Sequence, residues 1–143
     1  MEENIFAGIG KEEIRLPLDV LGEYANQFNS AFGKSLVFET LNVLENQEED
    51  WAKIDLFEEI KEPAERKFVT RAYVLAPNLG KYKMLVLKLS YLRSKVYPCE
   101  LYNALTDKKQ DCKTAEELDT ELRKLFVSEE FKKPIRVLLS QIG

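Results

Sequence analysis

Histidine is absent from this 143-residue chain. Its absence removes the commonest general base, the commonest metal ligand and the usual pH switch near neutrality. Ser-His-Asp catalysis, Cys-His catalysis and zinc sites built on histidine are therefore excluded. The glycine patterns that bind phosphate, GxxxxGKS/T and GxGxxG, are missing as well. Chemistry by carboxylates, lysine or tyrosine stays open, but no spacing of those residues marks a site. We therefore expect a protein that is not an enzyme and that holds no cofactor and no metal.

Cysteine is scarce, with Cys99 and Cys112 as the only two, and they lack CxxC spacing. Two cysteines are too few for a disulfide scaffold. In a reducing cytosol they are expected to be small, buried or half-buried thiols. The alternative is a redox pair that closes a short hairpin, and the sequence leaves open whether the two side chains meet.

Long apolar runs are missing too. No run approaches the roughly 18 consecutive apolar residues of a membrane-spanning helix, so no membrane partner is expected. Residues 1–5, with the sequence MEENI, lack the basic start and apolar run of a signal peptide. These features favour a cytoplasmic protein.

The composition that remains is typical of a globular protein, with 45% apolar and 32% charged residues. The length suits one domain with a substantial core. We expect a single α+β domain over residues 1–143, in which residues 1–12 are a loose lead-in.

Helical periodicity marks both ends of the chain. Apolar residues spaced three and four apart predict a helix over residues 17–32, with Pro17 in its first turn and Gly33 as its C-terminal cap. Thr114 to Glu117 match a capping box, which predicts a helix from there to about residue 126. A last helix follows, and Pro134 suggests that its continuous part begins at that residue.

Strand periodicity marks the middle of the chain. Residues 36–44 predict a strand, and the alternative for this run is a buried helical segment. Residues 67–76 and 82–91 predict an antiparallel hairpin. Strict alternation in the second hairpin strand places one set of side chains on a single face: Lys83, Leu85, Leu87, Leu89 and Tyr91. A third strand over residues 96–103 contains Pro98, which predicts either an edge position or a bulge. Residues 107–109 are expected to form a polar turn, and residues 51–60 fit either a helix or a strand.

This order of elements predicts the α+β class. We expect an antiparallel sheet of three to four strands, with an N-terminal helix and two C-terminal helices packed mainly on one face.

Charge is segregated along the chain. Residues 1–65 carry 5 basic and 16 acidic side chains, a net of −11, and residues 66–143 carry 16 basic and 9 acidic ones, a net of +7. Such a split bears on association rather than on fold. The plain interpretation is two solvated faces, and the alternative is a face that binds a partner of opposite charge. The expected interaction surface combines acidic, aromatic and basic residues: Glu48, Glu49, Asp50, Trp51, Lys83, Lys88, Arg93 and Lys95.

Other binding modes are less well supported by the sequence. The acidic run around Glu48 does not match an EF-hand and is expected to be a solvated loop. Tyrosines are frequent on the predicted strands, which invites base stacking, but packing across strands is the preferred interpretation, and nucleic acid is not expected as a partner. We therefore expect a non-enzymatic protein-interaction or accessory module, namely an adaptor, inhibitor or immunity-type protein, that binds a protein partner or associates with itself. The alternative is a regulatory domain that binds a small ligand in a tyrosine-lined pocket between sheet and helices.

Overall fold

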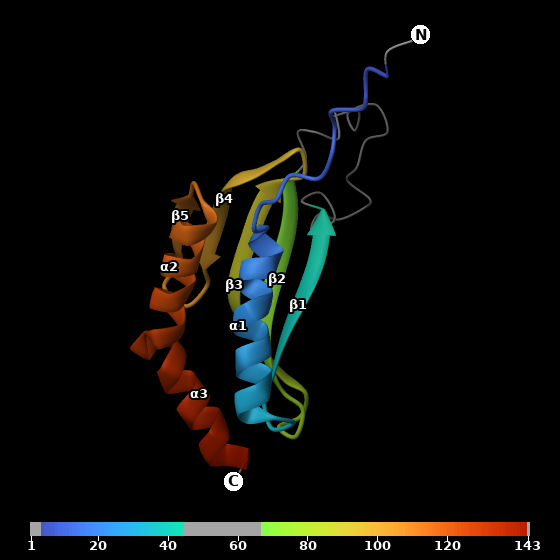
Figure 1. The fold of residues 1–143 in the computed structure, drawn as a ribbon. Coiled ribbons are helices and arrows are strands. Elements are labelled where there is room, and N and C mark those ends of the chain that lie inside the picture. Colours follow the sequence, from blue (N-terminus) through green and yellow to red (C-terminus); the bar gives the residue numbers. More distant parts are fainter. Residues whose placement is uncertain (1–3, 45–66, 143) are drawn as a thin grey trace, which may run out of the picture.

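Three helices and five strands make up the part of the chain that the computed structural model describes, residues 4–44 and 67–142. One helix is followed by five strands and two helices, so the fold is α+β, as the sequence predicts (Figure 1). The elements are α1 (Pro17–Phe32), β1 (Val37–Leu44), β2 (Lys67–Ala76), β3 (Tyr82–Leu92), β4 (Lys95–Asn103), β5 (Lys108–Cys112), α2 (Ala115–Val127) and α3 (Glu129–Ile142). Within these residues no helix is long and apolar enough to cross a membrane.

Helix α1 begins and ends where its sequence predicts. Pro17 lies in the first turn, where its missing N–H costs no helical hydrogen bond. The Asp19 carboxylate accepts a hydrogen bond from the Leu16 amide at 3.2 Å and puts a negative charge at the positive end of the helix dipole. At the other end, Gly33 has a φ of +60°, and its N–H donates to the carbonyl of Asn29 at 3.0 Å. Local signals in the sequence therefore determine both ends of α1.

The strands form one antiparallel sheet in the order β1-β2-β3-β4-β5. The sequence predicted three to four strands and missed β5. Lys108 and Lys109 belong to this strand and not to a turn. Strand β5 is at the edge of the sheet and is exposed at every residue except Cys112. It therefore lacks the alternation of apolar and polar residues by which a strand is predicted.

A β-bulge interrupts β3. Ala72 of β2 pairs with Leu87, but the next residue, Tyr73, pairs with Leu85, so Val86 is an extra residue. The bulge reverses the alternation of side chains on either side of it. The expectation of one continuous face from Lys83 to Tyr91 was therefore wrong, because Lys83 and Leu85 lie on the opposite face from Leu87, Leu89 and Tyr91.

Strand β4 lies inside the sheet, between β3 and β5, so Pro98 is not at an edge. The pairing of β4 with β3 is irregular between Ser90 and Leu92, opposite the residues that include Pro98. Because proline has no amide hydrogen to donate to a ladder, an irregular segment is where an interior strand tolerates it. Of the two alternatives for Pro98, the bulge is the one observed.

The two C-terminal helices are capped by hydroxyl side chains. Thr114 Oγ1 accepts a hydrogen bond from the Glu117 amide at 3.1 Å, as the capping box predicts. The Glu117 carboxylate accepts from the amide of Lys113 at 2.6 Å, one residue before the position that the motif predicts. Ser128 Oγ accepts from the Phe131 amide at 3.3 Å, and α3 starts at Glu129. The expected start at Pro134 was wrong, because this cap and the buried Phe131 fix the helix start five residues earlier.

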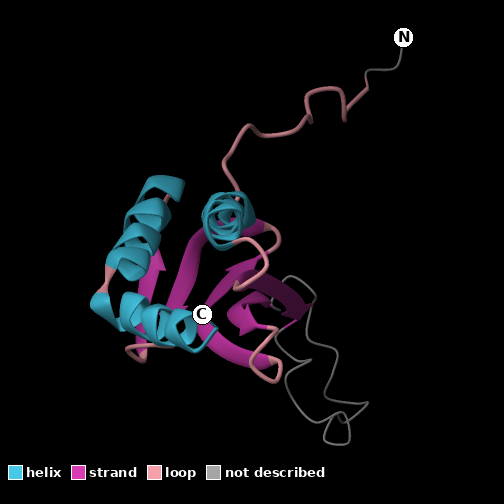
Figure 2. Cartoon of the chain, turned by 90° about the horizontal axis from the view of Figure 1, so that it is seen from below, coloured by secondary structure: helices cyan, strands magenta, loops and turns pink. Residues whose placement is uncertain are grey.

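All three helices cover the same face of the sheet (Figure 2). The core lies between them and the strands, and Leu87, Leu89, Leu118 and Leu122 are fully buried within it. An aromatic cluster links α1, β1, α2 and α3, with ring centroids 5.1–6.2 Å apart: Phe28, Phe38, Phe126 and Phe131. Ring pairs at such separations stabilise a core beyond the area that they bury. The helices are thereby held against one side of the sheet.

Candidate interaction surface

The other side of the sheet, which we call the open face, carries no helix among residues 4–44 and 67–142 (Figures 1 and 2). Residues that pair directly in an antiparallel sheet point to the same side. The register therefore defines a row of open-face side chains across all five strands: Leu41, Arg71, Lys88, Tyr102 and Lys109. Two shorter rows lie on the hairpin side of it, and they contain Glu39, Tyr73 and Leu85, and Val37, Leu75 and Lys83.

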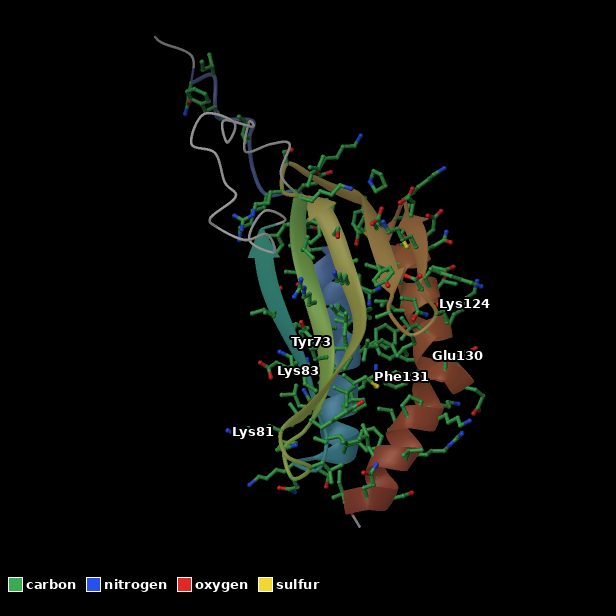
Figure 3. The ribbon with its side chains drawn as sticks, turned by 180° about the vertical axis from the view of Figure 1, so that it is seen from behind. Tyr73, Lys81, Lys83, Lys124, Glu130 and Phe131 are labelled. Carbon is green, nitrogen blue, oxygen red and sulfur yellow. The ribbon has the colours of Figure 1, made fainter. Side chains whose placement is uncertain are left out.

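Lysines stand over tyrosine rings on this face. The Lys83 Nζ lies 3.9 Å from the centroid of the Tyr73 ring, and both side chains point away from the helices (Figure 3). The Lys88 Nζ lies 6.0 Å from the Tyr102 ring centroid. A cation over an aromatic ring is stabilised by the ring quadrupole and keeps this interaction when water is removed. The open face therefore combines positive charge with flat apolar surface.

The β4–β5 turn holds Tyr102 in place. The Tyr102 hydroxyl donates a hydrogen bond to Asp107 Oδ1 at 2.6 Å, and this bond to a carboxylate raises the pKa of Tyr102. Asp107 has a φ of +57°, a conformation that aspartate tolerates better than most residues. At the edge of the face, the Glu100 carboxylate lies 4.0 Å from the Lys109 ammonium. The phenol ring of Tyr102 is thus fixed beside Lys88.

The bulge in β3 brings two of the predicted surface lysines together. With strict alternation, Lys83 and Lys88 would point to opposite faces, because they are five positions apart and five is an odd number. The extra residue Val86 restores both to the open face. Lys95 pairs with Leu92, which pairs with Lys67, so it belongs to the end of the same face.

Arg93 is not part of the open face. Its guanidinium carbon lies 4.6 Å from the ring centroid of Phe68, which pairs with the buried Tyr91 on the helix side of the sheet. The other predicted surface residues lie outside the described residues: Glu48, Glu49, Asp50 and Trp51. The same holds for the undecided segment 51–60.

Leu41 is one of the open-face residues that the expected interaction surface did not include. Its side chain is 46% exposed in the middle of β1. The run of residues 36–44 is apolar enough to suggest burial on both sides, so no local signal distinguishes Leu41 from the buried Phe38. Only the registers of β1 with β2 and of β2 with β3 place it in a row with Arg71 and Lys88.

The strand tyrosines do not form one platform. Tyr73 and Tyr102 lie on the open face, whereas Tyr91 is buried in the core. The Tyr97 hydroxyl donates to the carbonyl of Arg15 at 2.6 Å, and Tyr82 borders a groove on the helix side. A single-strand binder needs successive aromatic rings on one surface. This division of the tyrosines favours the packing interpretation for most of them.

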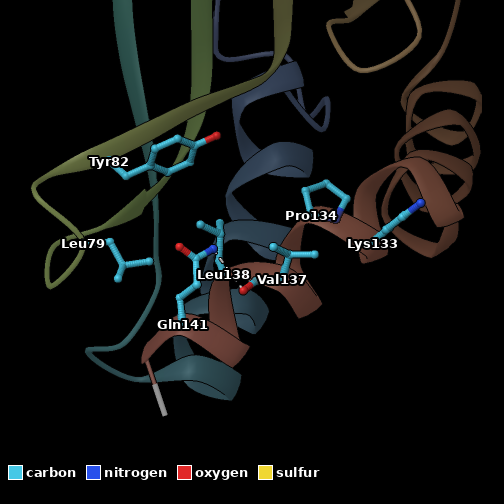
Figure 4. A pocket seen from close by; sticks show the side chains of 7 residues that line it. All are labelled: Leu79, Tyr82, Lys133, Pro134, Val137, Leu138 and Gln141. Atoms are coloured by element: carbon cyan, nitrogen blue, oxygen red, sulfur yellow. Dashed lines mark hydrogen bonds between the residues drawn. The ribbon is translucent and has the colours of Figure 1, made fainter.

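A groove lies between the β2–β3 hairpin and α3 (Figure 4). Its volume is about 450 Å³. The lining is mostly apolar and consists of Leu79, Tyr82, Lys133, Pro134, Val137, Leu138 and Gln141. Val137 is 52% exposed, so the groove is open to solvent on one side. Tyr82 is the only strand tyrosine in this lining.

Charged side chains also meet between α1 and α2. Tyr24 donates to the Asp119 carboxylate, and Arg15 forms ion pairs with Glu23 and, at 3.6 Å, with Asp119. Burial, followed by the bond to Asp119, raises the pKa of Tyr24. Within residues 4–44 and 67–142, no three cysteine, aspartate or glutamate side chains are placed to hold a metal ion. The cluster connects the two helices, and its groups already bind one another.

No protein-family model, curated protein or solved structure matches this chain.

Proposed function

We propose that this chain is a non-enzymatic protein-interaction or accessory module of the adaptor, inhibitor or immunity type, and that it binds its partner through the open face. One observation carries the proposal. In the described residues the three helices share one face of the sheet (Figure 2). The strand registers place Leu41, Tyr73, Leu75, Leu85 and Tyr102 on the other face. Apolar and aromatic side chains that gather on one uncovered face mark a candidate protein-binding site.

Charge points to the chemistry of the partner. Lys83 and Lys88 lie on the open face beside tyrosine rings, and Arg71 lies in the same row as Lys88. Acidic residues on this face lie toward its margins, at Glu39, Glu100 and Asp111. We therefore infer a partner surface that combines carboxylates with apolar groups, because complementary charge accelerates association and selects against other partners.

A protein fits this surface better than a nucleic acid does. The chain as a whole has a net charge of −4, whereas a nucleic-acid footprint is usually a dense basic patch. Leucines at three positions of the face offer apolar contacts that phosphates and sugars do not use. The tyrosines are divided between both sides of the sheet, which leaves two rings for stacking.

The test compares two matched double variants. Leu41→Glu with Lys83→Glu changes the open face, and Val137→Glu with Lys132→Glu changes α3. Each pair replaces one exposed aliphatic residue and one exposed lysine by glutamate, so the change in net charge is the same. The tagged proteins are used to purify partners from source cells at low and high salt. The affinity of each recovered protein is then measured with purified components.

The proposal predicts a protein with an acidic binding segment that binds wild type and the α3 variant alike. The open-face variant should bind it on the order of tenfold more weakly or worse, and added salt should weaken wild-type binding. A partner that is lost only from the α3 variant would contradict the proposal. So would binding of single-stranded RNA or DNA by the wild type that the open-face variant abolishes, or self-association of the purified chain through α3.

The groove between the β2–β3 hairpin and α3 supports a second candidate function, a regulatory domain for a small ligand. Its volume of about 450 Å³ is within the range of small-molecule sites, and its lining is mostly apolar with a few polar groups, as is usual for such sites. A ligand that binds only the native state must raise the unfolding temperature. Thermal-shift screening against nucleotides and metabolites, repeated on Val137→Arg, tests this. Stabilisation of wild type that the variant lacks would favour the ligand-binding function.

A further inference from the structure

The two cysteines of the chain meet in the folded protein. Cys99 on β4 and Cys112 on β5 are direct partners in the antiparallel register. Both are free thiols, and their exposed fractions are 1% and 0%. Both belong to the core that the helices cover.

The backbone already has the spacing that a disulfide requires. Directly opposite residues in an antiparallel pair have Cα atoms about 4.5 or 5.5 Å apart, depending on the hydrogen-bonding position. Disulfides form across Cα separations of about 4.4–6.8 Å. Because both side chains also point to the same face, oxidation requires rotation of the side chains and no displacement of the strands.

The two thiols are chemically unequal. A hydrogen bond between them lowers the pKa of Cys112 and, together with burial, raises the pKa of Cys99. Burial, followed by the carboxylates of Glu121, Glu117 and Asp111, acts in the opposite direction on the pKa of Cys112 but does not outweigh the thiol contact. Because the thiolate is the nucleophile in thiol chemistry, the thiol with the lower pKa is the one expected to react first, and the thiol opposite it in the strand register can attack the product.

We propose that Cys99 and Cys112 form a reversible dithiol–disulfide site that hydroperoxides oxidise. The Cys112 sulfur attacks the peroxide oxygen, the O–O bond breaks, and Cys112 sulfenic acid and one water are formed when the peroxide is hydrogen peroxide. The Cys99 sulfur then attacks the Cys112 sulfur, which forms the S–S bond and releases a second water. Two thiols lose two electrons and two protons, and the peroxide is reduced.

The place of the pair determines what oxidation changes. Within the described part of the chain, β5 is an edge strand that pairs with β4, and α2 begins at Ala115, close after Cys112. A bond between Cys99 and Cys112 would tie this edge strand and the start of α2 to the interior of the sheet. Oxidation should therefore slow amide hydrogen exchange in β5 and raise the thermal midpoint, since a crosslink restricts the unfolded chain.

The test uses the full-length protein, treated with hydrogen peroxide and then with dithiothreitol. Wild type is expected to lose both titratable thiols under denaturing conditions, to lose the mass of two hydrogen atoms, and to recover both thiols on reduction. Trypsin cleaves after Lys95, Lys108, Lys109 and Lys113, so the two cysteines fall on separate peptides, residues 96–108 and 110–113. A disulfide between these peptides in a non-reducing digest would identify the bond directly.

Single variants test the order of the steps. With dimedone as the trap, Cys99→Ser is expected to accumulate a sulfenic acid on Cys112, and Cys112→Ser is expected to label more slowly on Cys99. The wild-type digest shows whether the Cys99–Cys112 disulfide forms, even if a serine variant fails to fold. The proposal is overturned by a wild type that retains both thiols, gains the mass of oxygen instead, or forms only disulfide-linked dimers, and the assigned order is overturned by faster labelling of Cys99.

Discussion

Replacement of Asn29 by alanine is expected to weaken the attachment of strand β1 to helix α1. The Asn29 side chain makes two hydrogen bonds with the backbone of Phe38: its Oδ1 accepts from the amide at 2.8 Å, and its Nδ2 donates to the carbonyl at 3.2 Å. Among the strands of residues 4–44 and 67–142, β1 is at the edge of the sheet and pairs with β2 only. Asn29 therefore occupies the position at which a further strand would pair with Phe38, and it protects this edge.

The magnitude follows from the number of bonds and from the burial of Phe38. A typical hydrogen bond contributes about 0.5–1.5 kcal/mol, and a buried group left without a partner costs about 1–3 kcal/mol. Phe38 is only 4% exposed, so water reaches its backbone poorly. Loss of both bonds should cost about 2–3 kcal/mol. Alanine regains roughly 0.5 kcal/mol through its better helix propensity. The net loss in the free energy of unfolding is about 2 kcal/mol.

Urea unfolding monitored by circular dichroism measures this loss, with Asn26→Ala as the control. Asn26 is exposed on the same helix, so its replacement should be neutral or stabilising by about 0.5 kcal/mol. For a chain of this length, 2 kcal/mol corresponds to a decrease in Tm of about 4–8 °C for Asn29→Ala. Equal stability of the two variants would refute the reasoning, because it would mean that the two bonds contribute nothing to the native state.

Three further changes test other parts of the fold. Thr114→Ala should lower the free energy of unfolding by about 1 kcal/mol, since it removes the acceptor of the Glu117 amide, and Thr114→Ser should restore most of it in the same urea assay. Gly33→Ala should cost about 1–2 kcal/mol in thermal unfolding, because φ is +60° at this position, and an unchanged Tm would contradict that. Burial raises the pKa of Tyr97 to about 12. The Tyr97 hydroxyl donates a hydrogen bond to the Arg15 carbonyl. Because the unfolded side chain ionises near pH 10, stability should be complete below that pH and fall as the pH rises toward 12. Tyr97→Phe should lack this part of the alkaline loss in urea titrations, and an identical loss in both proteins would be the negative result.

Local signals predicted the limits of α1 and the start of α2. Pro17, Asp19 and Gly33 determine α1, and Thr114 caps α2 through a bond to Glu117, because each of these interactions joins residues a few positions apart. The β2–β3 hairpin was also predicted, from the alternation of its strands. Its turn has positive φ angles at Gly80 and Lys81.

Features that depend on distant contacts were not predicted. Strand β5 exists because it pairs with β4, and its polar sequence shows no alternation. Because of the bulge at Val86, the consecutive residues Val86 and Leu87 are both buried. A pattern in which buried and exposed residues strictly alternate does not predict two buried neighbours. Helix α3 continues through Pro134 because Ser128 caps it and Phe131 packs into the aromatic cluster.

The candidate surface was predicted in part for the same reason. Lys83 and Lys88 were chosen for their charge, but only the bulge places them on one face. Arg93 has the same charge, but it contacts the ring of Phe68 on the helix side of the sheet and is not on the open face. Leu41 and the opposed thiols of Cys99 and Cys112 depend on strand register, which a single sequence does not specify.

Photo-crosslinking tests the central claim most directly. A benzophenone amino acid is placed at Leu41 on the open face in one protein and at Val137 on α3 in another, both at exposed apolar positions. After irradiation in source cells, position 41 should capture a defined protein through an acidic segment, and position 137 should not. Capture of that protein at position 137 with none at position 41 would contradict the assignment of the open face as the binding surface.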